Sequence, residues 1–364
     1  MTTDRRQVEI IRRLADAPGP SGFEDEVLKA AREAVADLGC RIEEDHLRNL
    51  FIYRREHSGN KPVIMLDAHS DEVGFMIHSI KPNGTLRFVN IGGWALSGLA
   101  SSKVLVRNAE GRYIPGIIAL KPVHFMTAAE RAAGGGASSI SDLVIDIGAR
   151  SKEEAAEVFK IRIGEPVVPA VHFEFDEQND LFFGKAFDCR IGCAALLETL
   201  RRLDGLDLPC DVVGVLSSQE EVGERGVKVS VQHVRPAAAI CFEGCPADDT
   251  FTPDYAIQTA LKKGPMFRHM DTSVICSPRL QRLVLDLAAE KGLPVQESVR
   301  EGGGNDAAFV NTAIENGVPA VVAGVPVRYI HSMNCISSYF DYEATAALVT
   351  EVVKALTPEV IERL

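Results

Sequence analysis

The sequence lacks a long apolar run, an excess of basic residues and a closely spaced cysteine motif. No apolar segment among its 364 residues approaches the ~20 residues that a membrane-spanning helix needs. Lys and Arg number 39 against 51 for Asp and Glu, a net charge of -12, whereas phosphate binding needs a basic face. We therefore expect neither a membrane protein nor a nucleic-acid-binding protein.

The eight cysteines are scattered along the chain. Its two close pairs, Cys189/Cys193 and Cys241/Cys245, do not have the C-x-x-C spacing of a zinc ribbon or a redox site. Apolar positions near the N-terminus are interrupted by charge, which is not the pattern of a secretory signal. The sequence therefore indicates a soluble cytoplasmic protein with reduced, mostly buried thiols.

The pattern of apolar residues predicts two structural units. Residues 1–72 read as helix, helix, strand, strand, with Ser21 and Glu24 as a capping box before the second helix. Residues 73–167 contain short alternating segments between Gly- and Asn-containing turns, which is typical of a small β domain. Residues 124–139, rich in Gly, Ala and Ser, predict a mobile loop inside it.

From residue 168 strands and helices alternate, which predicts a sheet with a mostly parallel core and helices on both faces. The expected fold class is therefore α/β. A catalytic domain of residues 1–72 and 168–364 would be interrupted by an inserted β-barrel domain, residues 73–167.

Titratable side chains follow the apolar strands of the predicted α/β domain. Because ligands bind at the carboxyl ends of the strands in an open α/β sheet, we expect these side chains to meet at one edge. They are His69 at the end of VIMLDAH and Asp71 just after it, Glu220 and Glu221 after DVVGVLSS, Glu243 at the end of AAAICFEG, His331 after PAVVAGVP, and Asp188 before a helix. Imidazoles and carboxylates together suit divalent ions such as Zn²⁺, Co²⁺ or Mn²⁺.

Five segments in this region resemble the signature segments of the tetrahedral-type aminopeptidases, which include deblocking and glutamyl aminopeptidases and are sometimes labelled cellulases. The segments are LDAHSDEVGFM, GKAFDCRIGC, SSQEEVGERG, EGGGNDAA and VPVRYIHS, in the order of that family. IGGW (91–94) and KPVHFMTAAER (121–131) are similar to its inserted domain.

The resemblance implies a two-metal site that hydrolyses the N-terminal residues of peptides. Asp188 would bridge both ions, with His69 and Glu243 completing one site and Glu221 and His331 the other. Glu220 would be the general base for a hydroxide held between the ions, and Asp71 would orient His69. Zn²⁺ or Co²⁺ is expected, with Mn²⁺ as an alternative. The family usually has Asp where Glu243 stands, which puts the geometry of that site in question.

Charge balance supports this assignment, since two divalent ions neutralise three ligating carboxylates and one hydroxide. Such a cluster lowers the pKa of bound water to ~7. The resemblance also implies that the insert, which contributes no obvious ligand, joins subunits into a homo-oligomer, from dimer to dodecamer. The preferred N-terminal residue of the peptide is left open.

Two other functions compete with this interpretation. A glycoside hydrolase would use two carboxylates such as Glu220 and Glu221 across the sugar, but both histidines would then lack a role. A metal-free assembly or binding protein is the other alternative, although every expected ligand and the base are present. Residues 302–306 are predicted to form a tight turn near the site. His124 is predicted to be a surface residue, and Trp94 a packing residue of the core or of an interface.

Overall fold

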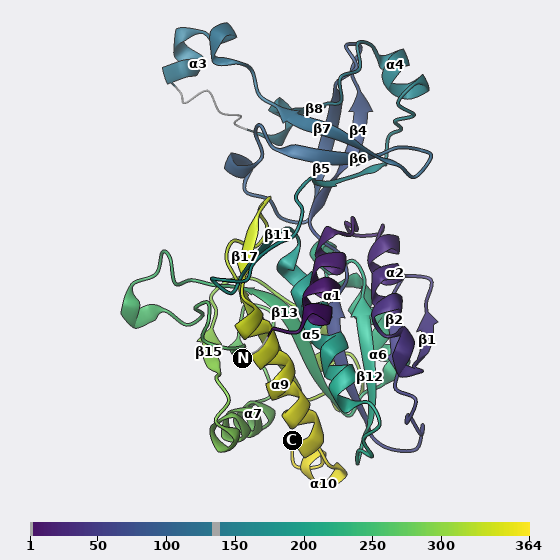
Figure 1. Ribbon diagram of the computed structural model, residues 1–364, viewed down its shortest axis with the longest axis vertical. Helices are drawn as coiled ribbons and strands as arrows, with labels where there is room; N and C mark the ends of the chain where they lie inside the picture. The colour runs from purple at the N-terminus through teal and green to yellow at the C-terminus, as the bar shows by residue number, and fades with distance from the viewer. Residues whose placement is uncertain (1–2, 133–138) are drawn as a thin grey trace.

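The computed structural model describes residues 3–132 and 139–364. Figure 1 shows a sheet with helices against it and, beyond one end of this sheet, a separate barrel. The chain passes from the sheet into the barrel after β3 (Val63–His69) and returns before α5 (Phe187–Leu203). The predicted α/β fold with an inserted β-barrel is confirmed.

The large sheet has eight strands, and its centre is parallel. Its order is β1 (Arg41–Glu44), β2 (Leu50–Tyr53), β12 (Asp211–Ser217), β3, β13 (Ala238–Pro246), β16 (Ala320–Val327), β14 (Met266–Met270) and β15 (Gln296–Val299). β12, β3, β13 and β16 run parallel to one another, while β2 and β14 flank them antiparallel. The functional segments therefore leave neighbouring strands at the same edge.

The central strands are nearly continuous apolar runs because both of their faces are covered. From Ile64 to His69 every residue of β3 is buried. α5 and α9 (Tyr339–Ala355) pack on one face, with α1 (Arg5–Asp16) against α5 and α7 (Pro278–Lys291) against α9. The other face carries α6 (Arg225–Val234) on β12 and α8 (Ala307–Thr312) on β13 and β16. α2 (Asp25–Ala34) packs on α1, and α10 (Pro358–Ile361) ends the chain.

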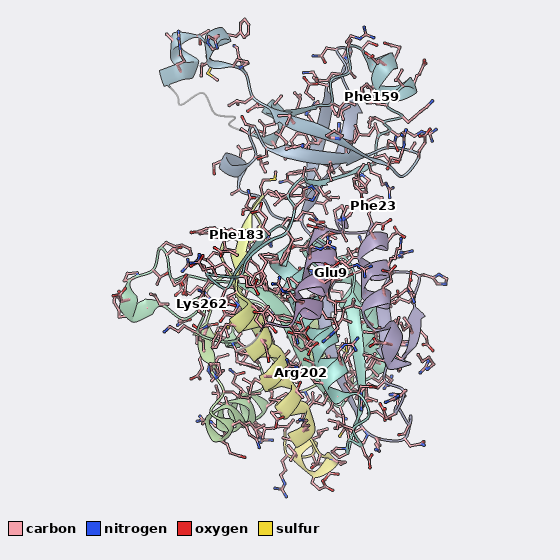
Figure 2. The ribbon with its side chains drawn as sticks, viewed as in Figure 1. Glu9, Phe23, Phe159, Phe183, Arg202 and Lys262 are labelled. Atoms are coloured by element: carbon pink, nitrogen blue, oxygen red, sulfur yellow. The ribbon has the colours of Figure 1, made fainter. Side chains whose placement is uncertain are left out.

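The inserted barrel closes with antiparallel pairing throughout. Its order is β4 (Gly74–Ile80), β5 (Leu86–Ile91), β8 (Val144–Asp146), β7 (Tyr113–Ala119), β6 (Lys103–Arg107) and β9 (Pro166–Pro169). The barrel has its own apolar core, on which Trp94 packs by stacking on Phe75 at a centroid distance of 4.8 Å. Phe23, labelled in Figure 2, lies 4.6 Å from the guanidinium of Arg107 and links the barrel to the N-terminal segment.

The predicted loop at residues 124–139 contains some regular structure. A 3-10 turn (Val123–Phe125) and the short helix α3 (Ala128–Ala132) lie in its described part, while residues 133–138 fall outside the described residues. α4 (Lys152–Glu157) follows β8. Within residues 3–132 and 139–364, no helix has both the length and the apolar character needed to span a bilayer.

The structure adds elements that the apolar pattern did not predict. These include a third sheet, β10 (Glu174–Asp176), β11 (Leu181–Gly184) and β17 (Cys335–Ser337), besides β1, β14 and α6. The predicted capping box is wrong: α2 begins after Glu24, which makes no side-chain cap bond. Ser21 instead donates its hydroxyl to Asp71, a residue of the predicted site.

Candidate active site

Six of the seven predicted site residues line a cavity of about 290 Å³ at the carboxyl ends of the central strands, and the seventh, Asp71, is buried beside His69. His69 ends β3, Glu220 and Glu221 follow β12, and His331 follows β16. Glu243 lies inside β13 rather than at its end, because this strand continues to pair with β16 through Pro246. Asp188 stands at the start of α5, where its own and the following dihedral angles are not helical.

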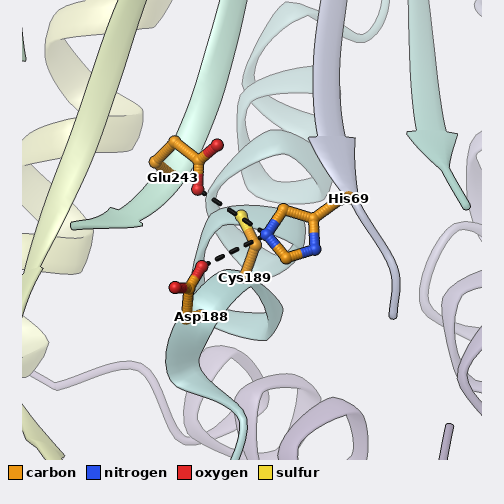
Figure 3. A group of neighbouring side chains, drawn as sticks. All are labelled: His69, Asp188, Cys189 and Glu243. Carbon is orange, nitrogen blue, oxygen red and sulfur yellow. Dashed lines mark hydrogen bonds and ion pairs between the residues drawn. The ribbon is translucent and has the colours of Figure 1, made fainter. Parts of the chain in front are cut away.

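One group of donors surrounds His69 (Figure 3). Its Nε2 lies 3.2 Å from Asp188 Oδ1 and 3.7 Å from Glu243 Oε2. Cys189 belongs to the same group, and its thiol donates a hydrogen bond to the carbonyl oxygen of Phe242 at 3.3 Å. His69 is 2% exposed, so its imidazole is shielded from bulk water.

A second group forms around His331 and shares Asp188 with the first. The Nε2 atom of His331 lies 3.4 Å from Asp188 Oδ2 and 3.3 Å from Glu221 Oε2. Asp188 thus directs one carboxylate oxygen toward each histidine. This is the arrangement of a carboxylate that bridges two ions.

These separations fit divalent ions. Ligand atoms about 2.0–2.1 Å from a tetrahedrally coordinated ion are roughly 3.3 Å apart, and the histidine–carboxylate distances span 3.2–3.7 Å. One oxygen of Glu221 is buried without a hydrogen-bond partner among the described residues. The donor set is therefore suited to two metal ions.

Asp71 connects the first histidine to the segment that carries Glu220 and Glu221. It is fully buried. Its Oδ1 accepts the Glu220 N–H at 3.0 Å and lies 3.3 Å from His69 Nδ1. Its Oδ2 accepts the Glu221 N–H at 3.2 Å and the Ser21 hydroxyl at 2.5 Å. One carboxylate thus positions a histidine and both glutamates.

Glu220 and Glu221 lie in a short 3-10 turn (Glu220–Val222). The turn is bounded by left-handed residues, Gln219 before it and Gly223 after it, the latter at φ 111. The compact turn lets neighbouring side chains point differently: Glu221 approaches His331, whereas Glu220 Oε2 lies 4.0 Å from His69 Nε2. Glu220 is thus near both groups without joining the His331 pair.

Burial among other acids favours protonated carboxyl groups here. Burial, reinforced by Asp188, raises the pKa of Glu221 to about 8. Burial also raises the pKa values of Glu220 and Glu243. Burial alone would lower the pKa of His331, but the facing Asp188 and Glu221 raise it to about 9. The cluster carries more acid than its histidines can neutralise, which favours the binding of cations.

The barrel also reaches this site through backbone. A Cβ atom on Gly93 would lie 3.2 Å from His331 Nδ1, and one on Gly92 would lie 2.7 Å from Val73. Both contacts would be tighter than ordinary van der Waals contact, so the IGGW turn packs directly against the second donor group. Gly302–Gly304 line the same cavity, in agreement with the turn predicted beside the site.

Sequence reasoning missed four residues of this region. Cys189 was read as a buried thiol, although it follows Asp188 directly. Ser21 was assigned to a helix cap. Arg268 and Arg300 line the cavity, and nothing in their local sequence marks them. His124, predicted to be a surface residue, is exposed and lies outside the two donor groups.

Comparison with known proteins gives a consistent family. The sequence profile described as M42 glutamyl aminopeptidase matches residues 49–348. The glutamyl aminopeptidase of Lactococcus lactis is 31% identical over 96% of both chains. The lysyl aminopeptidase of Pyrococcus furiosus is 29% identical over 96% of this chain and 97% of its own length.

Solved structures agree with these relatives. A TET aminopeptidase from a marine sediment thaumarchaeon has a TM-score of 0.92 at 35% identity, covering 98% of this chain and 99% of its own. The TET1 peptidase of Pyrococcus horikoshii, which can assemble into a tetrahedron or a large octahedral shell, has a TM-score of 0.85 at 29% identity. That match covers 96% of this chain and 100% of its own.

Proposed function

The chain belongs to the M42 glutamyl aminopeptidase family and is a peptide hydrolase, and we propose that it removes single residues from free peptide amino ends with two divalent metal ions. The observation that carries this proposal is the position of Asp188. Its two oxygens face His69 and His331 separately, at 3.2 and 3.4 Å. His69 and Glu243 would hold one ion, and Glu221 and His331 the other.

The ions, Zn²⁺ or Co²⁺ with Mn²⁺ as the alternative, would lower the pKa of water and polarise the scissile carbonyl. Glu220 is the proposed general base. It lies within the cavity but outside the His331 pair, and burial raises its pKa, which brings it closer to the pH at which a base works best. It would take the proton of the attacking water and deliver it to the leaving amine.

Asp71 is the proposed positioning residue. By accepting both backbone N–H groups of the turn, it fixes where Glu220 and Glu221 point. Its contact with His69 Nδ1 leaves Nε2 facing the donor group. Partners of this kind set the orientation and basicity of a metal-binding histidine.

A glycoside hydrolase is not favoured by this geometry. Its two carboxyl groups must face one another across a sugar ring. Here an oxygen of Glu220 and one of Glu221 lie within 4.8 Å of a His69 nitrogen and of each other, which is closer than the ~5–9.5 Å that a sugar between two carboxyl groups requires.

We also propose that the chain forms a homo-oligomer through the barrel. Large apolar side chains are exposed on the barrel and on the loop that follows β7, with Phe125 at 74% and Val123 at 59%. Contiguous exposed apolar side chains commonly mark protein contacts. Light scattering tests this proposal, and a monomer at every concentration would contradict it.

The central test is Glu220→Gln, assayed with aminoacyl chromogenic substrates after adding Zn²⁺, Co²⁺ or Mn²⁺ to metal-free protein. Metal content and thermal stability should remain near wild type, while kcat falls about 10²–10⁴-fold because the base is lost. Near-normal turnover, or loss of a metal, would show that Glu220 has another role.

A further inference from the structure

The cavity has a second wall that the proposed reaction does not use. Besides the donor groups it is lined by Arg268, Arg300, Glu224 and Gly302–Gly304. The side chain of a substrate's N-terminal residue has to occupy space beside the metal ligands. The names of relatives do not show whether this substrate side chain is acidic or basic, because one similar protein is a glutamyl aminopeptidase and another is a lysyl aminopeptidase.

Arg268 is buried and only partly paired. Its residue is 5% exposed, and its Nη1 donates to Asp271 Oδ2 at 2.7 Å. Nε is buried without a hydrogen-bond partner among the described residues, and the hydrogen bonds described for this side chain use only Nη1. Among the described residues, the Nε–Nη2 edge of its guanidinium therefore has no hydrogen-bond partner.

Asp271, which accepts the hydrogen bond of Arg268, is itself held in place by other residues. Asp271 also accepts a hydrogen bond from Asn305 Nδ2 at 2.7 Å and from the Ser273 hydroxyl at 2.7 Å. A rigid acceptor at Nη1 prevents the guanidinium from turning its free edge away. Such preorganisation reduces the entropy lost when a ligand binds.

Arg300 adds positive charge to the same wall. Its Nη1 donates to Asp248 at 3.2 Å, and its Nη2 donates to the carbonyl of Pro246 at 3.0 Å and to the Thr259 hydroxyl. Nε again lacks a partner among the described residues. Most of its donors are occupied, so Arg300 is less suited than Arg268 to bidentate binding.

Leaving a buried guanidinium edge unpaired is unfavourable, because water cannot replace the missing hydrogen bonds. A carboxylate matches the two parallel N–H groups of an arginine edge and adds charge attraction. We propose that this wall is the pocket for an acidic N-terminal residue, Glu or Asp, whose carboxylate binds the Nε–Nη2 edge of Arg268. This inference rests on the proposed aminopeptidase function.

Glu224 is the feature that favours the opposite choice, a basic residue. It lies close to Gly304, where a Cβ would be 3.0 Å from its Oε1, and it is only partly buried. A lysine side chain in the cavity would meet the guanidinium of the more deeply buried Arg268, and this like-charge contact is unfavourable. The acidic residue is therefore favoured, and the basic one is an outcome that the experiment must be able to detect.

The experiment compares glutamyl, aspartyl, glutaminyl, leucyl and lysyl chromogenic substrates on the metal-loaded enzyme. We expect kcat/KM for the glutamyl substrate to exceed that for the neutral, nearly isosteric glutaminyl substrate by at least about 100-fold, because the buried arginine edge would otherwise stay unpaired. In Arg268→Met the glutamyl-to-leucyl ratio should fall by a similar factor, and Arg268→Lys should restore part of it.

Two further variants serve as comparisons. Arg279→Met removes an arginine that hydrogen-bonds the C-terminal segment and does not line the cavity. It should leave the substrate ratios unchanged. Glu224→Gln should not raise the glutamyl-to-lysyl ratio by more than a few-fold. Circular dichroism and metal analysis on every variant identify loss of fold.

The outcomes separate the two proposals. Preference of the wild-type enzyme for leucyl or lysyl substrates overturns the acidic pocket while leaving the aminopeptidase function intact. Equal loss on all substrates in Arg268→Met and Arg268→Lys also overturns it. Failure to cleave any of the five substrates with any of the three metals contradicts the proposed function itself.

Discussion

Asp71→Asn tests how the buried carboxylate organises the site, and the structure specifies where its effect should appear. The substitution keeps the shape of the side chain and replaces one acceptor oxygen by an NH2 donor. If the amide oxygen takes the place of Oδ1, it still accepts the Glu220 N–H and still faces His69. In the opposite orientation both of those groups would face a donor, so the first orientation is preferred.

The NH2 group then stands where Oδ2 stood, facing the Glu221 N–H and the Ser21 hydroxyl. The hydroxyl can turn and become an acceptor, but the backbone N–H cannot. One buried N–H therefore loses its partner, at a cost of about 1–3 kcal/mol. Partners of metal ligands typically change metal affinity by about 10–100-fold, which agrees with this range. Because Glu221 loses the contact, we expect the ion of Glu221 and His331 to be weakened more than the other.

Competition titration with a chromogenic chelator, followed by metal analysis, measures both affinities. Ser21→Ala is the matched control, since it removes one donor to Asp71 and leaves the Glu221 contact in place, so its effect should be smaller. The reasoning would be refuted if Asp71→Asn bound both ions as tightly as wild type, or weakened only the ion of His69.

Three further predictions address other parts of the molecule. Stepwise chelation should first remove the ion of His69 and Glu243, because their 3.7 Å separation is the longest among the ligand pairs; earlier loss from His331 would contradict this. Burial raises the pKa of Asp341 from 3.8 to about 6, which corresponds to roughly 3 kcal/mol. Since the folded state favours protonated Asp341, this stabilisation is complete below pH 4 and is lost as the pH rises through 6. In denaturant unfolding, the wild type should therefore lose stability relative to Asp341→Asn across that window. Parallel pH profiles of the two proteins would exclude this effect. Phe125→Asp should shift the light-scattering mass toward smaller species without changing the barrel's circular dichroism, and an unchanged mass would place the contact elsewhere.

The sequence was sufficient to predict that these side chains lie at one edge of the sheet, because strand ends determine their positions, whereas their division into two groups followed from the family resemblance. The run VIMLDAH is buried on both faces, so its final His69 had to reach the carboxyl edge of the sheet, where β12, β13 and β16 also deliver their side chains. Direction along a parallel sheet is fixed by the chain itself. The distances between side chains are not fixed in this way, so the separation of each oxygen of Asp188 from its histidine could be known only from the structure.

Residues that act across long sequence separations could not be predicted in this way. Ser21 and Glu24 have the spacing of a capping box, yet Ser21 is used by a carboxylate 50 residues away. A local pattern cannot reveal that competition. Arg268 lies in a short strand, and the alternation of apolar and polar residues there gives no sign that its guanidinium is buried against the cavity. Its significance depends on which of its donors lack partners, a property of packing alone.

We expect the barrel to serve assembly and to contribute no ligand, yet its IGGW turn lies against a proposed metal ligand. A Cβ atom on Gly93 would make a tight contact with His331, and one on Gly92 would overlap Val73. Any displacement of this turn would therefore press on a proposed metal ligand, because packed interiors transmit strain. The exposed Phe125 and the turn at Gly93 belong to the same inserted unit. An assembly held through this barrel would therefore also hold the turn against His331, so that subunit contacts and the geometry of the second ion would depend on one another.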